Sequence, residues 1–164
     1  MARIIPNENT WIGFTPASLT DISAPTAAQV ADAIDLTGFC ISLNASARGN
    51  TVPTPSFDSL FETSTAGTSA ATFDADFYRD DEDDTAWETL TRGTRGYFII
   101  ARFGGTGTAN PGEENLPVAD DDVEVWPVMI TSRTMANMSS NTVLTFTASC
   151  AVMEEPAENA VVAA

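Results

Sequence analysis

Apolar and polar residues alternate with a period of two in residues 71–80. One face of this segment carries Phe73, Ala75 and Phe77. The other face carries Thr72, Asp74, Asp76 and Tyr78. Successive side chains of a β-strand point to opposite faces, so the alternation predicts a half-buried strand with an acidic outer face.

Other segments also favour β-strands. Residues 95–103 are apolar on both faces, as in a strand covered from both sides. Residues 122–135 are rich in β-formers, but Pro127 interrupts them and predicts an edge or a bulge. Residues 141–153 alternate with a period of two, and residues 35–45 do so less regularly. These segments predict a mainly β protein.

A short helix is predicted between two of these strands, at residues 85–92. Asp84 is placed to cap its N-terminus, and Gly93 follows where a left-handed C-cap residue belongs. Trp87 and Leu90 are three residues apart, so they share the helical face expected to pack on the sheet.

The remaining segments are less regular. Residues 25–34 predict a short helix or turn, capped by Ser23 or Thr26. Residues 46–70 combine Pro, Gly, Ser and Thr and predict a long loop, with an interruption by a strand around Phe57 to Thr63 as the alternative. Residues 154–164 predict a flexible tail. We therefore expect one domain, a β-sandwich or open barrel with one short flanking α-helix.

Composition excludes most catalytic chemistry. The 164 residues include no His and no Lys. With seven Arg and 23 Asp and Glu residues, the net charge is −16. Without His there is no imidazole base to activate a Ser or Cys nucleophile. Without Lys there is neither a P-loop nor Schiff-base chemistry. Binding to nucleic acid through phosphate contacts is disfavoured as well. We expect no enzyme, no catalytic residue, no cofactor and no resident metal.

Five consecutive acids at residues 80–84 leave three interpretations open. An EF-hand fails, because Thr85 stands where the loop requires Gly and Thr91 where it requires Glu; an irregular Ca²⁺ site remains an alternative. A catalytic carboxylate pair needs two separated environments, which adjacent acids in a turn do not provide. The favoured interpretation is a strand-to-helix junction whose acids face the positive end of the helix dipole.

Three features concern redox state, phosphate binding and the membrane. Cys40 and Cys150 are expected to be free thiols, with a disulfide as the alternative. The segment FGGTGTANPG lacks the third Gly of a dinucleotide loop, so it predicts a hairpin loop. No apolar run approaches the length of a signal peptide core or of a membrane span. The sequence predicts a soluble protein made in a reducing cytoplasm.

Four segments together resemble the major tail proteins of long-tailed bacteriophages, particularly those of actinobacteria. They are SAPTAAQVADAIDLTGF, FYRDDEDDTAWETLTRGTRGYFIIARFGG, VEVWPVMITSRTM and NTVLTFTASCAVMEEP. The resemblance covers residues 18–156 and rests on order and spacing rather than on a catalytic signature. It implies the tail tube fold, which is also that of the Hcp protein of type VI secretion.

The resemblance further implies a virion protein, assembled in the host cytoplasm, whose hexameric rings stack into a hollow tube for DNA ejection. Partners would be other copies and the tape measure, terminator and baseplate proteins, with no membrane contact. Residues 46–70 would stack the rings, and residues 1–20 and 154–164 would be arms. The candidate stacking residues are Arg48, Asn50, Phe57, Leu60 and Phe61.

Acids on the wall of such a tube would repel passing DNA without binding it. The candidates for the lumen are Asp74, Asp76 and Glu124. Two other function classes stay open. One is a different β-rich virion component, a connector or decoration protein; the other is an acidic module that binds Ca²⁺ or carbohydrate.

Overall fold

The computed structural model describes residues 9–55, 57, 61, 63–107 and 115–164. It contains eight strands and two five-residue helices within these residues. The strands are β1 (Trp11–Thr15), β2 (Ile34–Asp35), β3 (Cys40–Thr54), β4 (Thr63–Tyr78), β5 (Arg95–Ala101), β6 (Asp122–Met135), β7 (Thr145–Val152) and β8 (Ala157–Val161). The helices are α1 (Ala27–Ala31) and α2 (Thr85–Thr89).

All of the named strands belong to one antiparallel sheet. Its order is β2-β1-β5-β6-β7-β4-β3, and β8 pairs with β6 beside this path. The predicted strand at residues 122–135 coincides with β6, and the acidic strand at residues 71–80 forms the body half of β4. The mainly β architecture expected from the sequence is confirmed.

The sheet curls over its own apolar face. Phe73 of β4 stacks on Phe98 of β5 with ring centroids 4.5 Å apart, although β6 and β7 lie between these strands in the sheet. Trp126 of β6 joins them at 5.7 Å from Phe73. Rings from non-adjacent strands meet only if the sheet bends around them, so the core fills an open barrel. Leu90, directly after α2, is fully buried in the same core.

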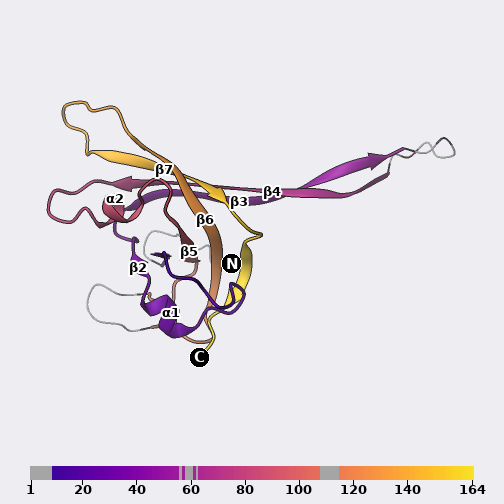
Figure 1. The fold of residues 1–164 in the computed structure, drawn as a ribbon, viewed down its shortest axis with the longest axis horizontal. Helices are drawn as coiled ribbons and strands as arrows, with labels where there is room; N and C mark the ends of the chain where they lie inside the picture. The colour runs from indigo at the N-terminus through magenta and orange to yellow at the C-terminus, as the bar shows by residue number, and fades with distance from the viewer. Residues whose placement is uncertain (1–8, 56, 58–60, 62, 108–114) are drawn as a thin grey trace, which may run out of the picture.

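A second, smaller core covers the opposite face of β1, β5 and β6. Val30 of α1 and Ala160 of β8 pack there against Trp11, Ile99 and Val125. Figure 1 shows α1 and the C-terminal end of the chain at this side of the body. Apart from the exposed Arg95, the strand at residues 95–101 is therefore covered on both faces, as its apolar composition predicts.

The prediction of a loop at residues 46–70 is wrong. β3 and β4 continue as a paired hairpin from Ala47↔Ala71 to Thr54↔Thr63. Figure 1 shows this hairpin projecting far from the body. The side chains of residues 47–54 and 63–70 are exposed on both faces, so they need no apolar alternation, and backbone pairing alone defines the strands. We call these two paired segments the arm.

Neither terminus matches its predicted arm. Within residues 1–20, the segment Trp11–Thr15 is strand β1, buried at every position and paired with β5. Within residues 154–164, Ala157–Val161 is strand β8, which pairs with β6 and places Ala160 in the smaller core. Residues 1–8 lie outside the described residues.

Pro127 lies where one edge of β6 changes partner. β8 pairs with β6 up to Val125, and β7 pairs with it from Val128 onward. The Pro127 carbonyl accepts from the Met153 amide on that side, at 2.9 Å. A proline lacks an N–H to donate, and in this gap no strand requires one. The predicted local edge in β6 is confirmed.

The two helices correct the expectation of a single one. Thr26 caps α1 through a capping box with Gln29. Of the two predicted cap residues, Ser23 and Thr26, it is therefore Thr26 that caps this helix. Asp84 stands at the N-cap of α2 but makes no side-chain cap bond, because its carboxylate pairs with Arg79. Gly93 has the left-handed φ of +89°, but α2 ends at Thr89 with Leu90 as its C-cap, so the prediction of a helix to residue 92 with Gly93 as its C-cap residue is wrong.

Candidate functional surfaces: an acidic sheet face and a projecting arm

The outer face of β3, β4, β7 and the end of β6 is polar and is covered by no other described element. Strand register places its residues in lateral rows, such as Ser42, Asp76, Thr147 and Thr134. We call this the acidic face. Its members are Ser42, Asn44, Ser46, Thr72, Asp74, Asp76, Ser132, Thr134, Thr147 and Ser149.

Asp76 is the best-anchored carboxylate of the acidic face. It accepts hydrogen bonds from the hydroxyls of Ser42, at 2.6 Å, and Thr147, at 2.5 Å. These bonds, the one from Ser42 first, lower the pKa of Asp76 below its usual value. The adjacent Asp74 lies between Asn44 and Ser149 in the next row. The face thus holds fixed negative charge at neutral pH.

Acid should weaken the fold in part through Asp76. Because its pKa is lowered in the folded state, Asp76 stabilises the fold fully above its unfolded pKa of about 3.9. That contribution disappears as pH falls through the lower folded pKa. In Asp76→Asn we expect a shallower loss of melting temperature between about pH 5 and pH 2 than in the natural sequence. An equal pH dependence in both proteins would contradict this role.

Glu124 lies on the other side of the sheet. Its neighbours Val123 and Val125 point into the smaller core, so Glu124 points toward the barrel side. There it forms an ion pair with Arg102 and accepts from Trp126 Nε1 at 3.1 Å. Hydrogen bonding to Glu124 raises the pKa of the Arg102 guanidinium. The three acids predicted for one surface therefore separate into Asp74 and Asp76 on the acidic face and a neutralised Glu124.

α2 and the residue after it are anchored through Leu90 and Trp87. Trp87 meets Phe146 edge-on, with ring centroids 5.0 Å apart. The guanidinium carbons of Arg79 and Arg133 lie 4.2 Å and 3.8 Å from the centre of the Trp87 ring. Arg133 also donates to the Trp87 carbonyl at 2.5 Å. Two of the seven arginines thus hold one helix on the barrel.

Removing the Trp87 ring should detach α2. Trp87→Ala deletes the contact with Phe146 and both cation–π contacts. We expect the free energy of unfolding to fall by about 2–4 kcal/mol, measured by urea denaturation. Trp87→Phe should recover about half of that loss, whereas equal losses would show that ring packing is irrelevant here.

The acidic run is a junction between β4 and α2. Asp80 accepts from the Glu82 amide at 2.9 Å, and Asp83 accepts from the Thr85 amide and hydroxyl at 3.2 and 2.5 Å. The Arg79 guanidinium forms a bidentate ion pair with Asp84, in which Nε donates to Oδ1 at 2.7 Å and a terminal nitrogen donates to Oδ2 at 2.5 Å. Across the described residues, no group of three or more His, Cys, Asp or Glu is arranged to hold a metal ion.

The arm presents neutral side chains. Arg48 and Asn50 lie on its β3 strand and are exposed, and Arg48 is the only charged residue of the two paired segments. Beyond the paired strands, Phe57 and Phe61 are exposed. Leu60 lies outside the described residues. The candidate stacking residues that the structure describes therefore occur along or beyond one projecting element.

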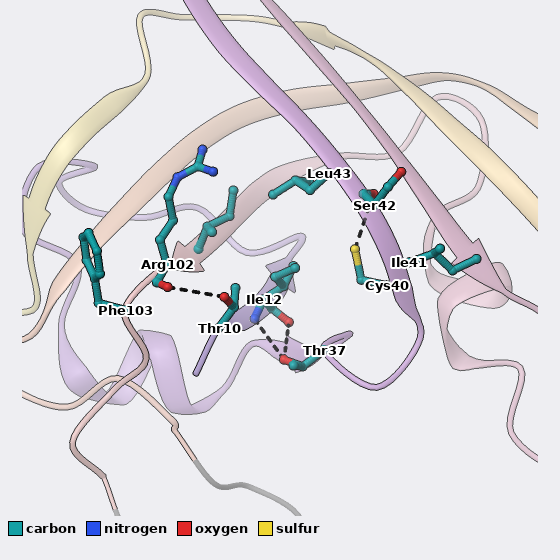
Figure 2. A pocket seen from close by; sticks show the side chains of 10 residues that line it. Thr10, Ile12, Thr37, Cys40, Ile41, Ser42, Leu43, Arg102 and Phe103 are labelled. Carbon is teal, nitrogen blue, oxygen red and sulfur yellow. Dashed lines mark hydrogen bonds between the residues drawn. The ribbon is translucent and has the colours of Figure 1, made fainter. Parts of the chain in front are cut away.

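An open pocket lies where the curled sheet fails to close, between β1 and the start of β3 (Figure 2). Its volume is about 580 Å³. We call it the seam pocket; it is lined by Thr10, Ile12, Thr37, Cys40, Ile41, Ser42, Leu43, Ile100, Arg102 and Phe103. The sequence does not predict it, because these residues come from four separate segments.

Both cysteines are free thiols. Burial, with the Asp76 charge as the next cause, raises the pKa of Cys40 to about 11. Burial also raises the pKa of Cys150, to about 12. Their reactivity at neutral pH is low, because the thiolate is the nucleophile. None of the described helices has the length and apolar character needed to cross a membrane.

Comparison with solved structures defines the fold class. The chain is similar to a protein in the sixfold-symmetrised baseplate of the anti-feeding prophage (TM-score 0.57, 9% identity, 94% of this chain and 95% of that chain covered). It is also similar to a protein in the C6-symmetric tail of an empty gene transfer agent particle (TM-score 0.55, 17% identity, 94% of this chain and 97% of that chain covered). A third similar protein belongs to the native gene transfer agent virion (TM-score 0.53, 15% identity, 91% of this chain and 94% of that chain covered). The chain has the fold of proteins from tail assemblies.

The family follows from the sequence. The family model described as phage tail tube protein matches residues 1–164, the whole chain. The chain belongs to this family and is a structural subunit of the tail tube, located in the virion tail. No curated protein sequence matches it significantly. The resemblance seen in the sequence is confirmed, and the family favours the tail tube over a connector, a decoration protein or a ligand-binding module.

Proposed function

We propose that six copies form a ring with the acidic face turned inward, and that stacked rings form the conduit through which DNA leaves the virion. The observation that carries this proposal is the acidic face itself. It is a curved, uncovered sheet surface in which Asp74 and Asp76 are held among hydroxyl and amide groups. Charge and hydration on such a wall suit a channel for a polyanion.

The electrostatics of the acidic face favour passage over binding. Asp76 remains ionised because Ser42 and Thr147 donate to its carboxylate. Screening at physiological salt acts over about 8 Å, so wall charge still acts on DNA in a narrow bore. The members of the face include no arginine, so phosphates find no cation to bind. DNA should therefore pass without specific contacts, and no catalysis is required.

The arm suits the contact between successive rings. It extends well beyond the body of its own subunit and buries none of its side chains there (Figure 1). We assign Arg48, Asn50, Phe57, Leu60 and Phe61 to this stacking contact. The tape measure, tail terminator and baseplate proteins would bind the ends and interior of the tube, and assembly would take place in the host cytoplasm, away from membranes.

Negative-stain electron microscopy of the purified, concentrated protein tests this proposal. We expect rings or hollow tubes with sixfold end views. If only monomers form at every concentration, even when assembled tail tips are added as initiators, the proposed self-assembly is wrong. Calcium titration followed by calorimetry is the companion control, and we expect neither heat nor a melting shift.

A further inference from the structure

We propose that the seam pocket of one subunit receives the aromatic tip of the arm, Phe57 and Phe61, from a copy in the adjoining ring. This inference rests on the proposed stacking of rings and names the surface that receives the arm. The seam pocket has an apolar floor, Ile12 and Ile100, and an exposed Phe103 at its edge (Figure 2). An open apolar cavity of this kind accepts large side chains that anchor an interface.

A subunit cannot fill its own seam pocket with its own tip. Cys40 to Leu43 line the pocket, and β3 then runs outward as an extended strand to Thr54. Phe57 follows Leu43 by fourteen residues. At about 3.3 Å per residue, the tip lies up to about 46 Å from its own pocket. The occupant must therefore come from a second copy.

Charge distinguishes the seam pocket from two other hollows of the described surface. The hollow at the base of the arm is lined by Glu154, Glu155 and Glu158 together with Arg48, and a third hollow is lined by Glu154 together with Arg95. The seam pocket lining has no carboxylate; its one ionised residue, Arg102, is paired with Glu124.

The sequence of the tip matches this charge pattern. Asp58 and Glu62 directly follow Phe57 and Phe61. Glutamates in the lining of the other two hollows oppose an aromatic, acidic tip, whereas the seam pocket lining offers apolar side chains and no carboxylate. The match favours the seam pocket over those two hollows.

The geometry also limits the spacing of rings. If tip and pocket meet through displacement of one copy along the arm, that displacement cannot exceed the reach of the arm, about 46 Å. A tube reconstruction that shows rings further apart than this would exclude the contact.

Cross-linking between copies tests the contact directly. The test variant combines Phe57→Cys with Ile41→Cys, which lies at the exposed edge of the seam pocket. The matched control combines Phe57→Cys with Val143→Cys, which is exposed on the β6–β7 connection. A short bis-maleimide is added to preformed tubes, and products are separated on denaturing gels. We expect a covalent ladder with Ile41→Cys and none with Val143→Cys or the natural sequence, whose two thiols have raised pKa values.

A second pair of variants covers failure of the cysteine proteins to assemble. Ile41→Asp puts a charge into the seam pocket, and we expect the concentration needed for tubes to rise on the order of tenfold or more. Val143→Asp should leave it unchanged. Tubes with no Ile41→Cys ladder, or equal assembly of both Asp variants, would overturn this inference alone. Absence of tubes from the natural sequence would instead overturn the proposed function.

Discussion

Shortening the arm is expected to abolish tube formation and leave the subunit folded. The variant joins Arg48 to Ala70, a paired position of β3 and β4, by Asn-Gly in place of residues 49–69. The arm buries none of its side chains, so the free energy of unfolding should change by less than about 1 kcal/mol. Stacking loses the long hairpin that projects from the body (Figure 1). Electron microscopy and thermal melting measure the two effects.

Two comparisons make the arm result specific. Val52→Ala alters an exposed side chain of the arm and keeps its length, so this control should still form tubes. Tubes of normal length from the shortened variant would show that the arm does not join the rings. A shortened variant that melts far below the natural protein would show that the arm supports the fold.

Phe73→Ala should be the most destabilising single substitution in the body. Phe73 is fully buried, stacks on Phe98 at 4.5 Å and touches Trp126 at 5.7 Å, at the point where the curled sheet meets itself. Removing the ring leaves a cavity between non-adjacent strands that the backbone cannot easily close. We expect a loss of about 3–5 kcal/mol, measured by urea denaturation of the monomer.

Tyr78→Ala is the matched control for this core prediction. Tyr78 ends the same strand but is 41% exposed. Removing its side chain should lower the free energy of unfolding by less than about 1 kcal/mol. If Phe73→Ala costs no more than Tyr78→Ala, the curled barrel core does not hold the sheet closed.

The strands that build the body could be predicted because their side chains are sorted by burial. Phe73, Ala75 and Phe77 alternate with polar residues because one face of β4 closes the barrel. Residues 96–101 carry no charged side chain because α1 and β8 cover their second face. In both segments the buried positions require apolar side chains, so the positions of apolar residues in the sequence indicate which faces are buried.

The arm and β8 could not be predicted because nothing requires such a pattern there. Residues 47–54 and 63–70 are exposed on both faces, and Thr, Ser, Ala and Gly satisfy a hairpin as well as a loop. β8 forms through backbone pairing with β6 and buries only Ala160 among its five residues. Two Thr-rich runs that flank an aromatic tip are the one signal that could have indicated the hairpin.

The candidate site was predictable only in part, for a related reason. Alternation in β4 assigns Asp74 and Asp76 to the face opposite Phe73, and the structure places them there. β6 has apolar residues on both faces, so its sequence does not reveal that Glu124 turns toward Arg102. The seam pocket depends on where the curled sheet stops, and no single segment contains that information.

A cryo-electron microscopy reconstruction of assembled tubes, at a resolution that shows side chains, tests the central claim most directly. We expect six subunits per ring with Asp74 and Asp76 on the lumen wall. Six subunits with these two residues on the outer surface or buried between rings would contradict it, even if the tube itself is intact.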